Sequence, residues 1–173
     1  MLENEIIKLR ALEPTDIEII YNWENNTNIW NVSNTITPFA KHIIKEYIES
    51  AHLDIYQTKQ LRLIIETNNT PIGTIDLFDF DPYNLRAGIG ILIAEDKNKQ
   101  KGYATSALNL FIEYAFNTLG LHQIYCNISE SNSPSLKLFK NAKFEIIGNK
   151  KDCNKTVNGF ENEYILQLIN KQI

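Results

Sequence analysis

The chain has 173 residues, of which 43% are hydrophobic, 10% aromatic and 22% charged. This length and composition predict one globular domain spanning residues 1–173, and they exclude a disordered chain, a collagen-like repeat and a disulfide-stapled miniprotein. The formal net charge of −4 argues against a protein that holds nucleic acid on a broad basic face.

The amino terminus and the cysteines indicate a cytoplasmic protein. Residues 1–5 contain two acids and begin no apolar run, so we expect no signal peptide. No apolar stretch reaches the roughly 18 residues that a membrane-spanning helix needs, so we expect no membrane partner. Cys126 and Cys153 belong to no CxxC motif and no Cys/His cluster, which favours two unpaired thiols in a reducing compartment.

The first half of the chain predicts one strand, two helices and then three strands. Pro14 and Asp16 are typical of the first turn of a helix, and Thr37-Pro38 begins a second helix in the same way. The runs that predict strands here cover residues 6–10, 61–66, 72–80 and 87–94. Turns at 68–69 and 82–84 separate the last three runs, which favours a meander of antiparallel strands.

The second half of the chain begins with a long amphipathic helix. Its apolar face consists of Ala104, Ala107, Leu108, Phe111, Ile112 and Ala115. A strand over 124–128, a short helix capped at Asn132 and strands over 144–148 and 163–168 complete the order β-α-α-β-β-β-α-β-α-β-β. The order predicts an α/β fold with a mixed sheet and helices on its faces.

Residues 89–105 carry the clearest chemical signal. An apolar strand runs into a polar loop, and the loop turns through Lys101-Gly102 into the long helix. Amides at a helix start lack partners inside the helix, and the helix dipole adds positive charge there, so this turn is suited to hold a diphosphate. Lys97, Lys99 and Lys101 add further positive charge. The other interpretation is a solvated basic loop in which the glycine only eases a turn.

Two motifs in this half resemble the GNAT N-acetyltransferases. Lys99-Gln100-Lys101-Gly102-Tyr103-Ala104 is similar to the acetyl-coenzyme A signature of that family, in which an Arg or Gln precedes two residues, a Gly, one residue and a Gly or Ala. A second motif follows at the expected distance, with Asn132, Ser135, Leu138, Phe139 and Phe144. The segments 9–16 and 23–26 also resemble the branch that contains ribosomal-protein, spermidine and nucleotide-aminosugar acetyltransferases.

The resemblance implies a fold, an activity and a cofactor. The fold is the GNAT fold, with a central, mostly antiparallel sheet that splays apart and is flanked by helices. The activity is transfer of an acetyl group from acetyl-coenzyme A to a primary amine by direct attack in a ternary complex, without a metal. His42, His52 and His122 share no metal-ligand spacing, and no serine lies in a nucleophile elbow.

The resemblance also places the cofactor contacts. The strand edge at Ile91, Leu92 and Ile93 would pair with the pantetheine arm, and an amide near Ile93 would stabilise the oxyanion. The residues expected around the pyrophosphate are Lys99, Gln100, Lys101, Gly102, Tyr103, Ala104 and Thr105. Asn132 and Ser135 begin the second motif, where Asn132 either contacts the cofactor or acceptor side or only caps its helix.

The chain departs from the family pattern at several positions. Lys99 replaces Arg or Gln, and Gln100 and Lys143 stand where glycines are common. A lysine held at positive φ at position 143 would cost roughly 1 kcal/mol. Phe139 replaces the tyrosine that many members use to protonate the thiolate, so no general acid is assigned. Gly88 stands where many relatives carry a glutamate.

The general base is therefore expected among the acids of the strand over 72–80 and its end. Asp76 and Asp79 are the catalytic candidates, because the spermidine-type relatives have acids at matching places near the polyamine cleft. Either carboxylate would accept the ammonium proton directly or through water, or anchor a distal ammonium of the acceptor. Holding amine and thioester together supplies several further kcal/mol.

The acids near the expected acceptor side favour a small cationic amine, such as a polyamine, as the acceptor. They are Asp76, Asp79, Asp81, Glu24 and Glu46. A protein amino terminus and an aminosugar nucleotide are the alternative acceptors. A catalytically silent acyl-coenzyme A sensor is the alternative from another class, and Phe139 and Gly88 favour it. The relatives are usually dimers, which implies a homodimer.

Overall fold

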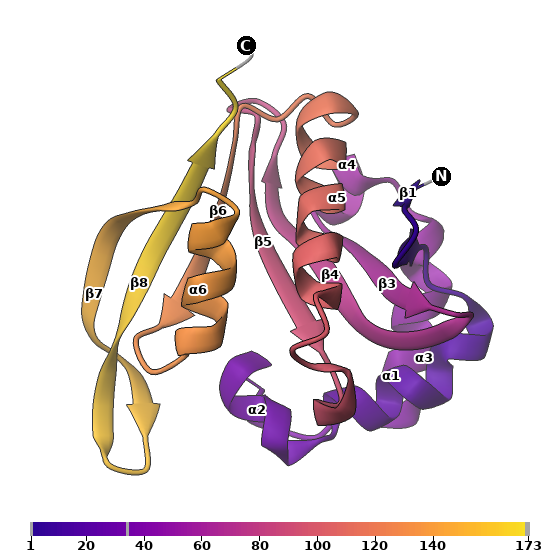
Figure 1. Cartoon of the computed structure of the whole chain (residues 1–173). Helices are drawn as coiled ribbons and strands as arrows, with labels where there is room; N and C mark the ends of the chain where they lie inside the picture. The colour runs from indigo at the N-terminus through magenta and orange to yellow at the C-terminus, as the bar shows by residue number, and fades with distance from the viewer. Residues whose placement is uncertain (1, 34, 172–173) are drawn as a thin grey trace.

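A computed structural model describes residues 2–33 and 35–171 of the chain, and Figure 1 shows its mixed sheet with helices on both faces. The strands are β1 (Leu2–Glu3), β2 (Lys8–Arg10), β3 (Leu61–Thr67), β4 (Thr70–Asp81), β5 (Arg86–Ile93), β6 (Gln123–Ser129), β7 (Glu145–Thr156) and β8 (Gly159–Ile169). The helices are α1 (Ile17–Glu24), α2 (Thr27–Ser33), α3 (Lys41–Glu49), α4 (Ile55–Thr58), α5 (Tyr103–Asn117) and α6 (Ser133–Asn141), with 3-10 turns η1 (Pro14–Asp16), η2 (Ser50–His52) and η3 (Asp96–Asn98).

The eight strands form one sheet in the order β1-β2-β3-β4-β5-β6-β8-β7. β5 and β6 run parallel, and the other neighbouring strands run antiparallel. The predicted meander is present as β3, β4 and β5. Asn68 and Asn69 form its first turn at φ values of 49° and 58°, a conformation that asparagine tolerates better than most residues.

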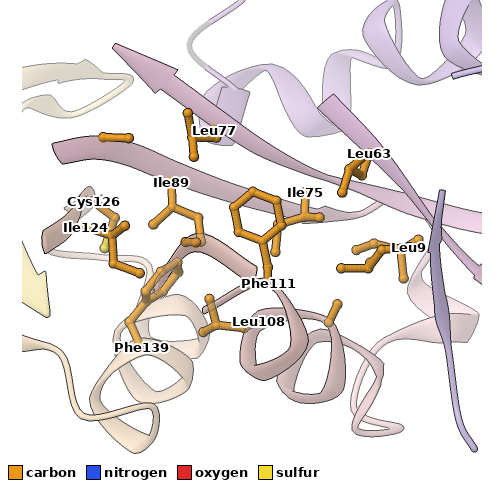
Figure 2. Packing of buried hydrophobic residues seen from close by; sticks show 14 of the residues in the cluster. Leu9, Leu63, Ile75, Leu77, Ile89, Leu108, Phe111, Ile124, Cys126 and Phe139 are labelled. Carbon is orange, nitrogen blue, oxygen red and sulfur yellow. The ribbon is translucent and has the colours of Figure 1, made fainter. Parts of the chain in front are cut away.

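Alternation along β3 sends side chains to two separate cores. Leu63 and Ile65 join the larger core beneath α5 and α6, where Figure 2 shows Leu108, Phe111 and Phe139 pointing toward the strands. Ile64 joins the smaller core with residues of α1, α2 and α3 on the other face of the sheet. The sheet is thus covered on both faces.

The structure differs from the sequence expectations in several places, and β1 and α4 are among the elements that were not predicted. The second helix begins at Lys41 with Ala40 as its N-cap, so Phe39 lies outside it. The helix α2 was not predicted. The last two strands are longer than expected and form a hairpin that continues to Thr156 and back from Gly159. Lys143 has a φ of 71°, so the condition under which a lysine at this position carries a conformational cost is met.

No helix in the described ranges has both the length and the apolar character needed to cross a membrane. Among these same residues, no group of three or more His, Cys, Asp and Glu side chains is arranged to hold a metal ion. Cys126 is buried and Cys153 is exposed, and both are free thiols.

A buried ion pair fixes the entry into α1. The Arg10 guanidinium donates to both carboxylate oxygens of Asp16, at 2.7 and 2.9 Å, and to Glu66 on β3 at 2.7 Å. The amide of Glu13 also donates to Asp16, whose exposed fraction is 3%. Burial opposes ionisation, but the hydrogen bonds from Arg10 and Glu13 lower the pKa of Asp16 below its usual range.

The substitution Asp16→Asn should lower the free energy of unfolding at neutral pH by about 2 kcal/mol, because it breaks a buried charge pair. A carboxyl with a depressed folded pKa stabilises only while it is ionised. The deficit should therefore be complete above the ordinary carboxyl pKa of about 4 and shrink as the pH falls below it.

Urea unfolding of both proteins at several pH values measures this difference. Glu18→Gln is the matched control, because Glu18 pairs with Lys41 on the exposed surface and should change stability by less than about 0.5 kcal/mol. A deficit for Asp16→Asn that persists unchanged at pH values below the folded pKa would contradict the role of this ion pair.

Candidate functional site

The sheet opens between β5 and β6. Their parallel ladder contains three residue pairs, Arg86–Gln123, Ala87–Ile124 and Gly88–Tyr125. Beyond Gly88 the strands diverge, as Figure 1 shows toward the bottom of the view. The stretch 89–93 of β5 is therefore paired with β4 on one side and faces the opening on the other.

The backbone direction along this free edge follows from one hydrogen bond. The amide of Ala94 donates to the carbonyl of Ile72 at 3.0 Å, and Ala94 continues the register in which Ile93 lies opposite Gly73. Backbone groups of successive strand residues alternate between the two neighbours. The amides and carbonyls of Ile91 and Ile93 therefore point away from β4 and into the opening, whereas Ile89 still faces the end of the β6 ladder.

The start of α5 presents unpaired amides. Gly102, its N-cap, has a φ of 82°, and Gln100 has a φ of 59°. The first helical hydrogen bond runs from the Ser106 amide to the Gly102 carbonyl. Within the described part of the chain, no amide of residues 100–105 donates a hydrogen bond. These amides and the helix dipole fit the pyrophosphate of an acyl carrier.

The charge of this loop is smaller than the sequence suggests. Lys97 pairs with Glu95 at 2.6 Å and Lys99 pairs with Asp96 at 2.7 Å. Lys101 is exposed, and over residues 2–33 and 35–171 it takes part in no ion pair. Main-chain amides, rather than lysine side chains, are thus the main groups that this loop has to offer to an anion.

A groove of about 770 Å³ lies where β3, β4 and β5 meet α1, α2 and α3. It is also lined from across the opening, by Asn127 of β6 and Glu163 of β8. Its polar lining comprises Glu24, Ser33, Thr35, Thr37, Gln60, Arg62, Thr74, Asp76, Asn127 and Glu163, and its apolar lining includes Trp23, Ile29, Ile36, Phe39, Ile43, Ile44, Tyr47 and Phe78.

The central polar feature of the groove is Arg62. Its guanidinium donates to Asp76 at 2.6 and 3.2 Å and also to Glu24, and it lies over the ring of Tyr47, 5.6 Å from the centroid. One cation is thus shared by two carboxylates. The three side chains carry a net charge of −1, and each is between 20% and 25% exposed.

Burial and charge act in opposite directions on this cluster. Burial raises the pKa of Asp76, and the neighbouring charge of Arg62 opposes that rise. Burial disfavours the charge of Arg62, but Asp76 and Glu24 raise its pKa above the usual value. Burial also raises the pKa of Tyr47, so Tyr47 is a neutral phenol at neutral pH.

Two glycines of β5 differ in the space beside them. A Cβ at Gly88 would lie 2.2 Å from the ring of Phe78, so the phenyl ring takes the space that a larger side chain at this position would need. A Cβ at Gly90 would have only one neighbour within 4 Å, the Phe78 ring at 3.8 Å. Gly90 lies directly opposite Asp76, and the floor is therefore open beside that carboxylate.

The structure separates the two catalytic candidates. Asp76 lines the groove. Asp79 lies outside it, on an irregularity of β4 at a φ of 51°, where it accepts a hydrogen bond from the Tyr125 hydroxyl at 3.3 Å. Asp81 accepts from Asn84 and Arg86 in the next turn, and Glu46 is exposed on α3.

The second motif has a structural role in this conformation. Asn132 accepts a hydrogen bond from the Ser135 amide at 3.2 Å and caps α6. Phe139 is 3% exposed and packs edge-to-face on Phe144, so its ring belongs to the core. The contacts of Asn132 and Ser135 with a cofactor remain a prediction.

Sequence reasoning missed Arg62, Asn127 and Glu163 as groove residues. A signal existed for Arg62, because a lone arginine inside the apolar run 61–65 is costly to bury without a partner. No comparable signal marks Asn127 or Glu163, which reach the groove only through the order in which β6 and β8 join the sheet.

Comparison with known proteins gives the family. Residues 7–145 match the family model described as the acetyltransferase (GNAT) domain. The chain belongs to this family. The expectations of a GNAT fold and of an N-acetyltransferase are thereby confirmed.

Two relatives and two solved structures illustrate the similarity. The spermidine N(1)-acetyltransferase of Vibrio cholerae is 28% identical over 142 residues, which cover 82% of this chain and 80% of that protein. The enzyme of that name from Escherichia coli K12 is 23% identical and covers 82% and 74%. A structure of the Vibrio cholerae spermidine N-acetyltransferase with CoA and spermine superposes with a TM-score of 0.86 at 23% identity, covering 96% of each chain. RimL, a ribosomal L7/L12 alpha-N-protein acetyltransferase, superposes with a TM-score of 0.80 at 13% identity, covering 96% of this chain and 92% of RimL.

Replacement of Gly102 by alanine should weaken coenzyme A binding by about tenfold, because a methyl group at positive φ strains the backbone and obstructs the approach of the pyrophosphate. Gly120→Ala is the matched control. Gly120 lies beyond the other end of α5 at a φ of 66°, and both glycines have open space around a Cβ.

Both variants should lose about 1 kcal/mol of stability, and calorimetry with coenzyme A should separate them. If the two variants bind coenzyme A equally well, the amides at the start of α5 do not hold it.

Proposed function

We propose that the protein transfers the acetyl group of acetyl-coenzyme A to a primary amine of a small polycationic acceptor of the polyamine class. The observation that carries this proposal is the net negative charge of one groove wall. There the two carboxylates of Glu24 and Asp76 share the single positive charge of Arg62, beside the open floor at Gly90. The spermidine acetyltransferases among the relatives give independent support.

On the donor side, main-chain groups do the binding. The amides at the start of α5 hold the pyrophosphate, and the β5 edge at Ile91 and Ile93 offers hydrogen bonds to the pantetheine arm, extending the sheet into the opening. When bound, acetyl-coenzyme A supplies an acetyl thioester. A β5 amide that points into the opening is placed to donate to the carbonyl oxygen of that thioester.

On the acceptor side, the groove attracts and orients a cation. The net negative charge at Glu24, Arg62 and Asp76 stabilises an ammonium group in a partly buried setting. Tyr47 and Phe78 offer ring faces that pack against methylene segments. A flexible chain of alternating methylene runs and ammonium groups matches this mixture of apolar and acidic lining.

Asp76 is the proton acceptor in this proposal. It lies opposite Gly90 on the floor of the groove, and its raised pKa brings it nearer to that of the ammonium group than an ordinary carboxyl. Asp79 stabilises the end of β4 by its contact with Tyr125. Phe139 is buried and lacks a hydroxyl, so it cannot protonate the leaving thiolate, and no general acid is assigned.

A protein amino terminus is the second candidate acceptor. Ile36, Phe39 and Ile43 line the groove while remaining 87%, 36% and 43% exposed. Apolar side chains gathered at the entrance of a groove favour an acceptor that carries an apolar side chain next to its amine. A polyamine has no such side chain, so the two candidates differ in a property that experiment can separate.

A panel of polyamines and neutral peptides tests the acceptor, with thiol release from acetyl-coenzyme A as the readout. We expect spermidine to exceed neutral peptides by about tenfold or more in kcat/KM, in keeping with electrostatic attraction into an acidic groove. The substitution Asp76→Asn should lower kcat about a hundredfold without changing coenzyme A affinity. Asp79→Asn removes the same charge outside the groove and should stay within about threefold of the wild type.

Three other results would overturn the proposal in different ways. A preference for neutral peptides would assign the protein-terminus activity. Equal losses in Asp76→Asn and Asp79→Asn would remove the catalytic role of Asp76. Binding of coenzyme A without turnover on any amine would indicate a sensor.

A further inference from the structure

The wall of the groove across the opening from Asp76 contains a buried carboxylate that the mechanism does not use. Glu163 lies on β8, lines the groove together with Asn127, and is 8% exposed. It is adjacent to Ser129 in the β6–β8 register. The carboxylate therefore belongs to the half of the sheet that diverges from β5.

An irregularity in β7 surrounds this carboxylate with donors. The β7–β8 register runs from Lys150–Glu163 to Asn154–Glu161. Three residues of β7 therefore lie opposite a single residue of β8. The extra residues form a bulge centred on Asp152. Asp152 has a φ of 49°, and its amide donates to the Asn162 side chain. Such bulges re-aim side chains near binding sites. Here Cys153 and Asn154 contact Glu163 in addition to Lys150, which lies directly opposite it in the register.

The contacts of Glu163 hold it in one orientation but do not saturate it. Oε2 accepts from Lys150 Nζ at 2.7 Å and from Cys153 Sγ at 3.7 Å. Among the residues that the structure describes, Oε1 accepts only a long contact from Asn154 Nδ2 at 3.4 Å. A carboxylate has about four acceptor sites. Oε1 therefore keeps capacity for a strong donor, and Asn154 is itself fixed by a 2.7 Å bond to Ser129.

The counter-charge of Glu163 is placed on its solvent side. Lys150 is 43% exposed, whereas the Glu163 side chain is 10% exposed. Solvent screens an exposed ammonium more effectively than a buried carboxylate. The groove therefore has negative character on both walls, at Glu24 and Asp76 on one side and at Glu163 on the other.

We propose that Glu163 is a specificity-determining residue that binds a second cationic nitrogen of the acceptor while the reacting amine lies beside Asp76. The inference rests on the proposed function, and it adds which residue recognises the second amine of the acceptor. The protein would then distinguish diamines and triamines from monoamines by a contact across the opening of the sheet.

The test compares butylamine, diaminobutane and spermidine, because the first two differ only in the second amine. Steady-state kcat/KM values are measured for the wild type, Glu163→Gln and Glu161→Gln. Glu161 is the matched control, since it lies on the same strand and accepts from the Ser131 amide without lining the groove. In the wild type, the kcat/KM of the better polyamine is divided by that of butylamine. Glu163→Gln should lower this ratio about tenfold, because it raises the KM for the polyamine and leaves kcat unchanged. Glu161→Gln should leave the ratio unchanged.

Calorimetry measures the binding of spermidine to coenzyme A-loaded protein without requiring acetylation. It therefore tests the contact with Glu163 independently of the proposed function. If no amine is acetylated, the proposed function fails, but about tenfold weaker spermidine binding by Glu163→Gln alone would still support the contact. Glu163→Asp should restore part of the affinity, because the charge is kept. An unchanged ratio, an equal loss for all three amines, or an absence of spermidine binding to the wild type would overturn the inference.

Discussion

The end of the β5–β6 ladder at Gly88 is the constraint on which the rest of the site depends. Inside a sheet, main-chain amides and carbonyls are normally paired, and unpaired ones are costly unless water or a ligand reaches them. Here the main-chain groups of Ile91 and Ile93 face an opening in the middle of the sheet instead of its outer edge. The start of α5 follows this same strand after a short loop. One continuous segment therefore supplies both the unpaired amides that would bind the pantetheine arm and those that would bind the pyrophosphate.

Irregular strand pairing arranges the acceptor side. In the β3–β4 hairpin the register shifts between Ile65 and Glu66, and this shift sets Arg62 opposite Asp76. Without the shift Arg62 would lie opposite Ile75, and since alternate residues face opposite sides, the arginine and the aspartate would be on different faces. The bulge in β7 shifts the register by two residues, so that Lys150 instead of Asp152 lies opposite Glu163. Two local departures from regular pairing thus place the charged groups of a groove built from otherwise regular strands.

The amount that the sequence could predict follows from these same features. Apolar and β-type runs identified β3, β4 and β5, and a helical stripe identified α5. It missed α2, whose residues 27–33 include asparagine, serine and threonine and give no clear stripe. The turn at Asn68-Asn69 predicted a hairpin but not its register, so the pairing of Arg62 with Asp76 could not be deduced. The groove contacts of Asn127 and Glu163 depend on strand order and on a bulge, and neither leaves a local mark in the sequence.

Amide hydrogen exchange, measured with and without coenzyme A, tests the central claim most directly. The amides of Ile91 and Ile93 and those of residues 100–105 should exchange readily in the free protein and become protected when coenzyme A binds. The neighbouring amide of Leu92, which faces β4, should be protected in both states. Protection that appears elsewhere on the protein while the amides of β5 and the α5 start stay unchanged would contradict the account.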